Sequence, residues 1–316
     1  MSAAVHVQPL RRHGRAHTTR AQRQPSLAAT THPFPAAHRS KARRTRIKCF
    51  ATAGVPPSPS SSWSTRLQDG SRVLVALLSV FRAFAFYVWT LALSVPLFLV
   101  MLVISPVVWR VDGVRRKALH WVNMVWANLS TWPFYRVNVE GERNLPPEGS
   151  PAVYVANHAS YLDIFTLFSL WRGFKFVSKT SNFMIPIVGW SMFLTGHVPL
   201  KRTDARSMKE MLLTCRYMLR EGAPVLIFPE GTRTSDGRMH AFKKGAFSVA
   251  AKAKVPVVPI TLIGTGELMP NGSEGTLKFG EVRVIVHPPI EGKDADELAK
   301  QARAAIAAPL DPERVA

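Results

Sequence analysis

Val153-Tyr154-Val155-Ala156-Asn157-His158-Ala159-Ser160-Tyr161-Leu162-Asp163 is the stretch that decides the fold. Its first four residues form a short, continuous apolar run, which is typical of a strand buried in a sheet. Ser160 and Asp163 then have the spacing of a helix capping box, which predicts that a helix begins there. A strand, a turn and a helix form the repeating unit of α/β proteins. The stretch therefore predicts an α/β domain in which helices cover a sheet.

Segments after Pro133 repeat this alternation, so the domain is expected to occupy residues 133–316. Further strands are expected at 135–140, 174–178, 225–228, 257–262 and 282–287. Between them, residues 206–220 place five side chains on one helical face: Met208, Met211, Leu212, Cys215 and Leu219.

His158 and Asp163 form a candidate catalytic pair. On one continuous helix they would lie about 140° apart and could not touch. They can meet if His158 lies in the turn and Asp163 in the first helical turn. The carboxylate then accepts the Nδ1–H and raises the basicity of Nε2. The capping box is an alternative use of Asp163, because a carboxylate bonded to the cap amide is less available to the histidine.

A second polar motif, Phe228-Pro229-Glu230-Gly231-Thr232-Arg233, also follows an apolar strand. Gly231 permits a tight turn, Glu230 can accept a hydrogen bond from a hydroxyl, and Arg233 offers a planar cation that pairs well with phosphate. More cations lie in Val198-Pro199-Leu200-Lys201-Arg202 and Phe242-Lys243-Lys244-Gly245. These basic pairs fit either a solvated surface or an anion pocket at the strand ends.

The first 48 residues have a composition of their own. They carry 11 Lys or Arg and no Asp or Glu, so about half of the formal net charge of +21 belongs to them. They lack a long apolar segment, which predicts a disordered organelle transit peptide at 1–48. A basic tail that binds nucleic acid or anionic lipid is the alternative. Residues 49–70 include a Pro-, Ser- and Gly-rich piece and are expected to be a flexible linker.

A membrane anchor with interfacial helices is expected at residues 71–132. Residues 83–109 contain no charge, and 27 such residues are enough to cross a bilayer. Pro96 and Pro106 are expected to kink or end the helix. The segment is either one transmembrane helix or a hairpin that turns near Ser94-Val95-Pro96. A buried helix of a soluble core is a third possibility, although 27 uncharged residues exceed the usual length of such helices.

Basic and aromatic residues follow this apolar run. Arg110, Arg115, Arg116 and Lys117 are expected to form a basic collar at a lipid surface. Residues 120–132, with three tryptophans, fit either a helix in the headgroup zone or an ordinary core helix. Residues 183–194 are mostly apolar and fit an acyl groove, a second membrane contact or simple core.

Four blocks resemble the lysophosphatidate and glycerol-phosphate acyltransferases of glycerolipid synthesis. They are Asn157-His158 through Asp163, Gly196-His197-Val198-Pro199-Leu200-Lys201-Arg202, Phe228-Pro229-Glu230-Gly231-Thr232-Arg233, and Val255-Pro256-Val257-Val258-Pro259-Ile260. The spacing, together with Lys-Gly-Ala-Phe at 244–247, is most similar to plastid 1-acylglycerol-3-phosphate acyltransferases. The second block departs from the Phe-Ile-Asp-Arg of many bacterial relatives, which leaves open whether Lys201 or Arg202 contacts phosphate.

The resemblance implies a mixed sheet and direct transfer of an acyl group from acyl-ACP or acyl-CoA to the sn-2 hydroxyl of lysophosphatidic acid. His158, oriented by Asp163, is the expected base. The expected phosphate contacts are Arg233, Lys201, Arg202 and Lys244. The residues expected to position the glycerol are Glu230, Gly231, Thr232 and Asn157. No metal or cofactor is expected, and the only two cysteines, Cys49 and Cys215, do not form a Cys-rich metal site. The lack of a Gly-x-Ser-x-Gly nucleophile motif is consistent with transfer that forms no acyl-enzyme.

Several alternatives stay open. The acceptor could be glycerol-3-phosphate or another lysophospholipid such as lysophosphatidylglycerol. A non-catalytic basic protein that binds membranes or nucleic acid would explain the charge, but it would not explain two unlike polar motifs at strand ends. The expected partners are therefore the bilayer, the lipid acceptor and the thioester donor, and no nucleic acid. Ile47-Lys48-Cys49-Phe50-Ala51 resembles the end of an algal chloroplast transit peptide, which implies a green alga and a plastid membrane, the inner envelope.

Overall fold

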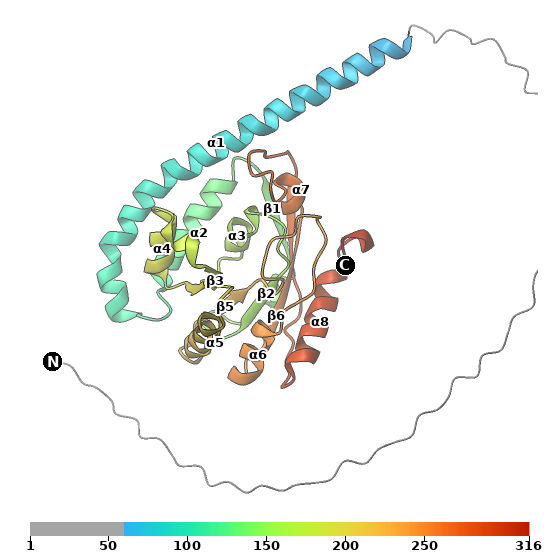
Figure 1. Cartoon of the computed structure of the whole chain (residues 1–316). Helices are drawn as coiled ribbons and strands as arrows, with labels where there is room; N and C mark the ends of the chain where they lie inside the picture. The colour runs from blue at the N-terminus through green and yellow to red at the C-terminus, as the bar shows by residue number, and fades with distance from the viewer. Residues whose placement is uncertain (1–59, 316) are drawn as a thin grey trace, which may run out of the picture. The chain divides into compact units, whose positions relative to one another are not determined.

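The structure, a computed structural model, describes the backbone of residues 60–315 and the side chains of residues 72–315 (Figure 1). The predicted transit peptide and residues 49–59 of the predicted linker lie outside this range. The helices are α1 (Ser60–Val111), α2 (Lys117–Thr131), α3 (Leu162–Leu167), α4 (Val188–Thr195), α5 (Ala205–Arg220), α6 (Gly245–Ala253), α7 (Thr265–Leu268) and α8 (Ala295–Ala307). The strands are β1 (Arg136–Glu140), β2 (Val153–Ala156), β3 (Lys175–Lys179), β4 (Val198–Leu200), β5 (Val225–Ile227), β6 (Val257–Ile263) and β7 (Glu281–Val286). Short 3-10 turns complete the order: η1 (Glu142–Asn144), η2 (Phe168–Leu170), η3 (Thr180–Met184) and η4 (Pro312–Arg314).

Seven strands form one sheet in the order β1-β7-β6-β2-β5-β3-β4. All neighbouring pairs are parallel except β6 and β7, which are antiparallel. The prediction of a mixed sheet covered by helices is confirmed. All six expected strands are present, whereas β4 was not predicted because it has only three residues, one of them Pro199.

Helices cover both faces of this sheet (Figure 1), and β2 contributes alternately to the two cores. Tyr154 and Ala156 pack with side chains of α1, α2 and α3. Val153 and Val155 pack on the other face with α5, α6 and α8. Because both faces of β2 are buried, its sequence is continuously apolar rather than alternating. On α5, Met208 is exposed, contrary to the expectation that all five apolar side chains share the buried face.

Helix α1 is longer than the sequence suggested. It begins at Ser60, so the expectation of a flexible linker is wrong for residues 60–70, where no proline follows Pro59 to interrupt a helix. Pro96 and Pro106 both lie inside α1, and neither ends it, so the hairpin alternative is also wrong. Pro106 cannot donate to the carbonyl of Leu102, four residues earlier, but the Ser105 hydroxyl donates to that oxygen at 3.1 Å.

Among the residues that the structure describes, one helix is long and apolar enough to cross a membrane, over Arg72–Val111. Ala83, Phe86 and Met101 are buried against the domain, while most other large apolar side chains of α1 are exposed. Forty helical residues measure about 60 Å, roughly twice the thickness of a bilayer core. This apolar surface continues onto α4, where Trp190 and Phe193 are exposed. The alternative that residues 183–194 simply belong to the buried core is therefore wrong.

Helix α2 has features of both predicted alternatives, a helix in the headgroup zone and an ordinary core helix. One face is buried in the domain and includes Leu119, His120 and Val122. Trp121 and Trp132 are exposed, whereas the indole of Trp126 donates to Ser94 Oγ at 2.9 Å and is partly buried. Helix α2 is therefore a core helix with Trp121 on its outer face, and Trp132 is exposed directly after its last residue.

Candidate active site

The turn between β2 and α3 brings His158 and Asp163 together. His158 Nδ1 lies 2.8 Å from Asp163 Oδ2, and the aspartate side chain is fully buried. A proton on Nδ1 donates to the carboxylate, which leaves Nε2 as an unprotonated acceptor. The contact predicted for these two residues is therefore present, with His158 in the turn and Asp163 in the first turn of α3.

Asp163 also caps the helix. The same Oδ2 accepts the backbone N–H groups of Ala159 at 2.8 Å and Ser160 at 2.9 Å. Ser160 Oγ accepts from Leu162 N at 3.2 Å and donates to the carbonyl of Met269 at 2.7 Å. Helix capping and orientation of the histidine are thus compatible, because one oxygen accepts all three donors.

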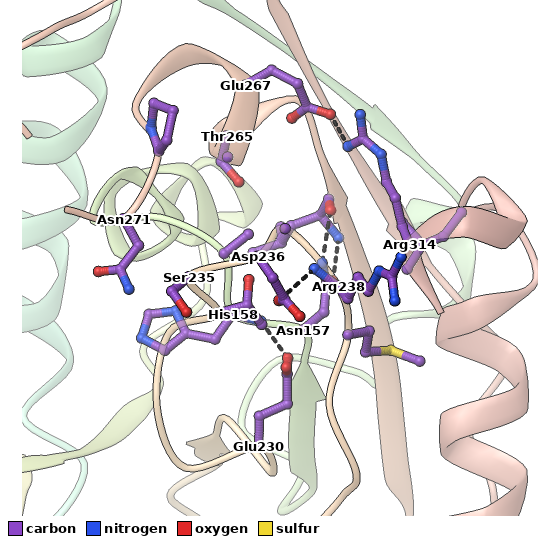
Figure 2. Close-up of a pocket in the computed structure, with 18 of the residues that line it drawn as sticks. Asn157, His158, Glu230, Ser235, Asp236, Arg238, Thr265, Glu267, Asn271 and Arg314 are labelled. Atoms are coloured by element: carbon purple, nitrogen blue, oxygen red, sulfur yellow. Dashed lines mark hydrogen bonds and ion pairs between the residues drawn. The ribbon is translucent and has the colours of Figure 1, made fainter. Parts of the chain in front are cut away.

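Glu230 joins the two predicted motifs. Its Oε1 accepts the backbone N–H of His158 at 2.7 Å, and its Oε2 accepts that of His240 at 2.9 Å. Burial raises the pKa of the Glu230 carboxyl, against the two N–H groups, which lower it. Figure 2 shows this carboxylate directed at the His158 backbone. Glu230 therefore holds the histidine loop in place, and its expected contact with the glycerol stays a prediction.

The imidazole ring also has a partner that the sequence analysis missed. Phe228 stacks on His158 with ring centroids 3.9 Å apart and an interplanar angle of 14°. Phe228 was visible as the first residue of the second motif, but nothing in the sequence indicated which way its ring points. Stacking and the bond to Asp163 together fix the orientation of the base.

Asn157 and Gly231 shape the backbone around the pair. Asn157 donates to the carbonyl of Leu262 at 2.9 Å and accepts its N–H at 2.8 Å, which ties the end of β2 to β6. Gly231 has φ +78°, and a Cβ there would lie 2.5 Å from Lys243 Nζ. Thr232, the residue between Gly231 and Arg233, is exposed. Contacts of these three residues with the glycerol remain predictions.

The predicted phosphate-binding arginines lie close to each other. Arg233 Nη1 is 2.8 Å from Glu274 Oε1. The hydroxyl of Tyr87 on α1 donates a hydrogen bond to the backbone oxygen of Glu274, with the two oxygens 2.9 Å apart. Desolvation and then the charge of Arg233 lower the pKa of Arg202. The two guanidinium groups thus lie near each other beside helix α1. One carboxylate, that of Glu274, pairs with Arg233 and offsets part of its charge.

The lysines differ from the expectation. Lys244 Nζ forms an exposed ion pair with Asp296 of α8 at 2.7 Å, so it is directed away from the other predicted residues. Its neighbour Lys243 instead places its ammonium against Gly231 in the second motif. Lys201 is exposed, and its backbone N–H donates to Ser207. The structure thus indicates Lys243, a member of the predicted basic pair, as the lysine beside the Glu-Gly-Thr-Arg turn.

A cavity of about 400 Å³ adjoins His158 (Figure 2). The predicted cations are not part of its lining, which comes from the ends of β2 and β5, the loop after β6 and the C-terminal segment. Asn157, His158, Thr234, Thr265 and Asn271 are among the lining residues. The hydroxyls of Thr234 and Thr265 are buried and have no hydrogen-bond partner among the described residues. The cavity therefore offers unsatisfied neutral polar groups next to the base.

Known acyltransferases are similar to this chain in sequence. The family model Acyltransferase matches residues 136–263. A 1-acyl-sn-glycerol-3-phosphate acyltransferase of Chlamydomonas reinhardtii is 53% identical over 286 residues, which cover 90% of this chain and 83% of that protein. The chain belongs to the 1-acyl-sn-glycerol-3-phosphate acyltransferase family.

Other members of this family are also similar. A chloroplastic enzyme of Arabidopsis thaliana is 54% identical over 215 residues, covering 68% of this chain and 60% of that protein. The crystal structure of the 1-acyl-sn-glycerophosphate acyltransferase from Thermotoga maritima superposes with a TM-score of 0.62 at 28% identity, covering 73% of this chain and 93% of that chain. The fold expected from the resemblance is thus shared with a solved member of the family.

Proposed function

We propose that this enzyme transfers a fatty acyl group from a thioester donor to the sn-2 hydroxyl of lysophosphatidic acid, giving phosphatidic acid. The 2.8 Å contact between His158 Nδ1 and Asp163 Oδ2 carries the proposal, because it leaves Nε2 as a base in a chain of this family. Lysophosphatidic acid is named as the acceptor because the similar proteins are 1-acyl-sn-glycerol-3-phosphate acyltransferases.

His158 Nε2 takes the proton of the sn-2 hydroxyl while the oxygen attacks the thioester carbonyl carbon. Asp163 stabilises the imidazolium that forms. The carbon–sulfur bond then breaks, and the imidazolium returns the proton to the departing thiolate. The scheme uses only side chains of the chain and the two substrates, with no acyl-enzyme.

The charge that develops on the carbonyl oxygen needs a partner outside the histidine turn. The backbone N–H groups of His158, Ala159 and Ser160 already donate to the carboxylates of Glu230 and Asp163. These three amides are therefore already occupied. Cations at the second motif remain the better source of stabilisation.

Arg233 is the proposed anchor of the acceptor phosphate, with Arg202 and Lys243 beside it. Glu274 is bonded to Nη1 of Arg233, and a guanidinium has five N–H donors, so others remain for phosphate oxygens. The hydrogen bond from Tyr87 of α1 to Glu274 supports this proposal, because it brings the partner of Arg233 next to the apolar helix where a lipid acceptor would arrive.

The cavity beside His158, whose lining does not include Arg233, Arg202 or Lys243, is the proposed entrance for the donor. Acyl-ACP and acyl-CoA share a pantetheine arm, which is neutral and rich in amide groups. Thr234 and Thr265 have unpartnered hydroxyls that could bond to such an arm. This assignment gives the two substrates different binding residues near the base.

The exposed apolar surface of α1 and α4 is proposed to hold the enzyme on a membrane. The relatives from Arabidopsis thaliana and Brassica napus are chloroplastic, which supports a plastid location, and the inner envelope is the proposed membrane.

A matrix of substrates tests the function. Purified protein in lipid–detergent micelles would receive lysophosphatidic acid, glycerol-3-phosphate or lysophosphatidylglycerol, each with acyl-ACP and with acyl-CoA. We expect the highest kcat/KM with lysophosphatidic acid, and none above background for His158→Ala. A higher kcat/KM with either other acceptor would overturn the assignment of the substrate. Binding that weakens steeply with salt, without turnover, would instead support the non-catalytic alternative.

A further inference from the structure

A second cavity, of about 520 Å³, lies at the opposite edge of the sheet from His158. Its lining includes Gly149, Gly173 and Pro224, which precede β2, β3 and β5 respectively. The catalytic turn and the Glu-Gly-Thr-Arg motif instead follow the carboxyl ends of β2 and β5. This cavity is therefore separate from the site of acyl transfer. The connection between α1 and α2 and the first turns of α2 form its remaining wall.

The cavity carries an excess of positive charge. Arg115, Lys117 and Arg172 line it, against a single acid, Glu148. Glu148 lies 3.5 Å from Lys117, and both of these side chains are exposed. Neither arginine has a carboxylate partner among residues 72–315. Two guanidinium groups are thus left to pair with an anion from outside the chain.

Arg115 is held in place by the backbone. Its Nε donates to the carbonyl of Glu221 at 3.0 Å. Its guanidinium rests on Gly149 and Gly222, where a Cβ would lie 3.2 Å and 2.1 Å from its terminal nitrogens. Both glycines also have positive φ, so a side chain there is disfavoured by the backbone conformation as well as by the nearby guanidinium. The guanidinium is thus fixed, and no acidic side chain in the described part of the chain pairs with its remaining N–H groups.

Some buried polar atoms in the wall of this cavity have no hydrogen-bond partner among residues 72–315. Within the described part of the chain, no group hydrogen-bonds to either ring nitrogen of His120, which is 0% exposed, or to the buried Nε of Arg172. Burial, and then the charges of Lys175, His197 and Arg116, hold the pKa of His120 well below its usual value. A neutral ring needs one donor and one acceptor, and buried polar groups are seldom left without them. The cavity therefore has donors that a ligand would satisfy.

The rim of the cavity resembles a membrane interface. Trp121 and Trp171 line it and are 58% and 48% exposed. Val111, the last residue of the apolar helix α1, is 81% exposed and lies four positions before Arg115. Tryptophan is enriched where a protein meets lipid headgroups. The positive cavity is thus continuous along the chain with the exposed apolar surface, which favours a lipid over a phosphate ion in solution.

We propose that this cavity binds the phosphate headgroup of an anionic membrane phospholipid. Arg115 and Arg172 donate to its phosphate oxygens, Lys117 adds charge at the mouth, and His120 bonds to a polar group at the inner end. The acyl chains extend past Trp121 toward α1. One lipid bound in this way fixes the α1–α2 connection at the membrane surface.

The test is a thermal-shift titration of the full chain in a neutral detergent. The probes are dihexanoyl phosphatidylglycerol, dihexanoyl phosphatidylcholine and inorganic phosphate. Phosphatidylglycerol should raise the Tm saturably, and phosphatidylcholine should not. Arg172→Gln should weaken the apparent Kd for phosphatidylglycerol by about tenfold or more, since a charge-assisted hydrogen bond is lost. Lys117→Glu, on an exposed side chain, provides a second variant that should fold even if Arg172→Gln does not.

Arg143→Gln is the matched control, because Arg143 is an exposed cation of η1 and does not line the cavity. Its Kd should equal that of the unmodified protein. An equal Kd for phosphatidylglycerol in the unmodified protein and both cavity variants would overturn the proposal. Equal shifts with phosphatidylcholine, or binding of inorganic phosphate as tight as that of phosphatidylglycerol, would overturn the assignment to an anionic lipid.

Discussion

Replacement of Asp163 by Asn tests the two tasks of this carboxylate separately. Its Oδ2 accepts from His158 Nδ1 and from the N–H groups of Ala159 and Ser160, at 2.8–2.9 Å. Asparagine has nearly the same size, and its carbonyl oxygen can still accept the two backbone N–H groups. It lacks the negative charge that stabilises the imidazolium, and the site is fully buried, so solvent cannot supply a substitute.

The expected loss is much larger in catalysis than in stability. We expect kcat to fall by about 10²–10⁴, as for other bases that lose their orienting carboxylate. At about 1.36 kcal/mol for each factor of ten, this corresponds to about 3–5 kcal/mol of transition-state stabilisation. Weaker capping bonds should lower the free energy of unfolding by only about 1–2 kcal/mol, which a folded domain tolerates.

Ser160→Ala is the control for capping. It removes the hydroxyl that accepts from Leu162 and donates to Met269, but leaves the contact between His158 and Asp163. It should lower stability by about 1 kcal/mol with little change in kcat. The assay is steady-state acyl transfer to lysophosphatidic acid, with Tm measured on the same samples. A folded Asp163→Asn variant with unchanged kcat would refute the reasoning, as would equal losses of kcat in both variants.

Three further results are expected. Lys243→Ala should raise KM for lysophosphatidic acid at least several-fold, because Lys243 lies against Gly231. Lys244→Ala should not raise it, because Lys244 pairs with Asp296. Equal KM values for both variants would count against an anion site at this turn. Cys215→Ala should keep kcat, and thiol reagents should not inhibit the folded enzyme, since burial raises the pKa of the Cys215 thiol to about 12; rapid labelling with loss of activity would contradict this. Burial lowers the pKa of Lys175 to about 7, from 10.5. Between these values the unfolded chain keeps a proton that the folded chain has lost, so this group makes stability rise with pH, by up to about 5 kcal/mol. Lys175→Met should flatten that rise in denaturation curves taken from pH 6 to pH 10, and an unchanged slope would show that another group causes it.

Much of the catalytic site could be predicted from the sequence. The apolar run before His158 indicated a buried strand, and a strand end exposes the polar residues that follow it. The choice between helix cap and histidine partner for Asp163 could not be made, because it depends on how many donors one oxygen accepts. Only the folded turn brings three of them to Oδ2.

Other features depended on contacts that the sequence does not encode locally. Lys243 and Lys244 are adjacent in the chain, yet the start of α6 directs them to different partners. The helix-breaking effect of Pro106 was overestimated, because Ser105 donates to the Leu102 carbonyl that the proline leaves without its usual donor. The second motif indicated Glu230 as a substrate contact, but it gave no sign that the two carboxylate oxygens also bind the backbone of His158 and His240.

The most direct test of the central claim is the rate of acyl transfer to lysophosphatidic acid by His158→Ala. The variant would be compared with the unmodified enzyme in the same lipid–detergent micelles, with Tm as the check on folding. Loss of the general base predicts that kcat falls by at least about 10²–10⁴ while Tm stays close to that of the unmodified enzyme. A folded His158→Ala enzyme that still forms phosphatidic acid at the original rate would contradict the account.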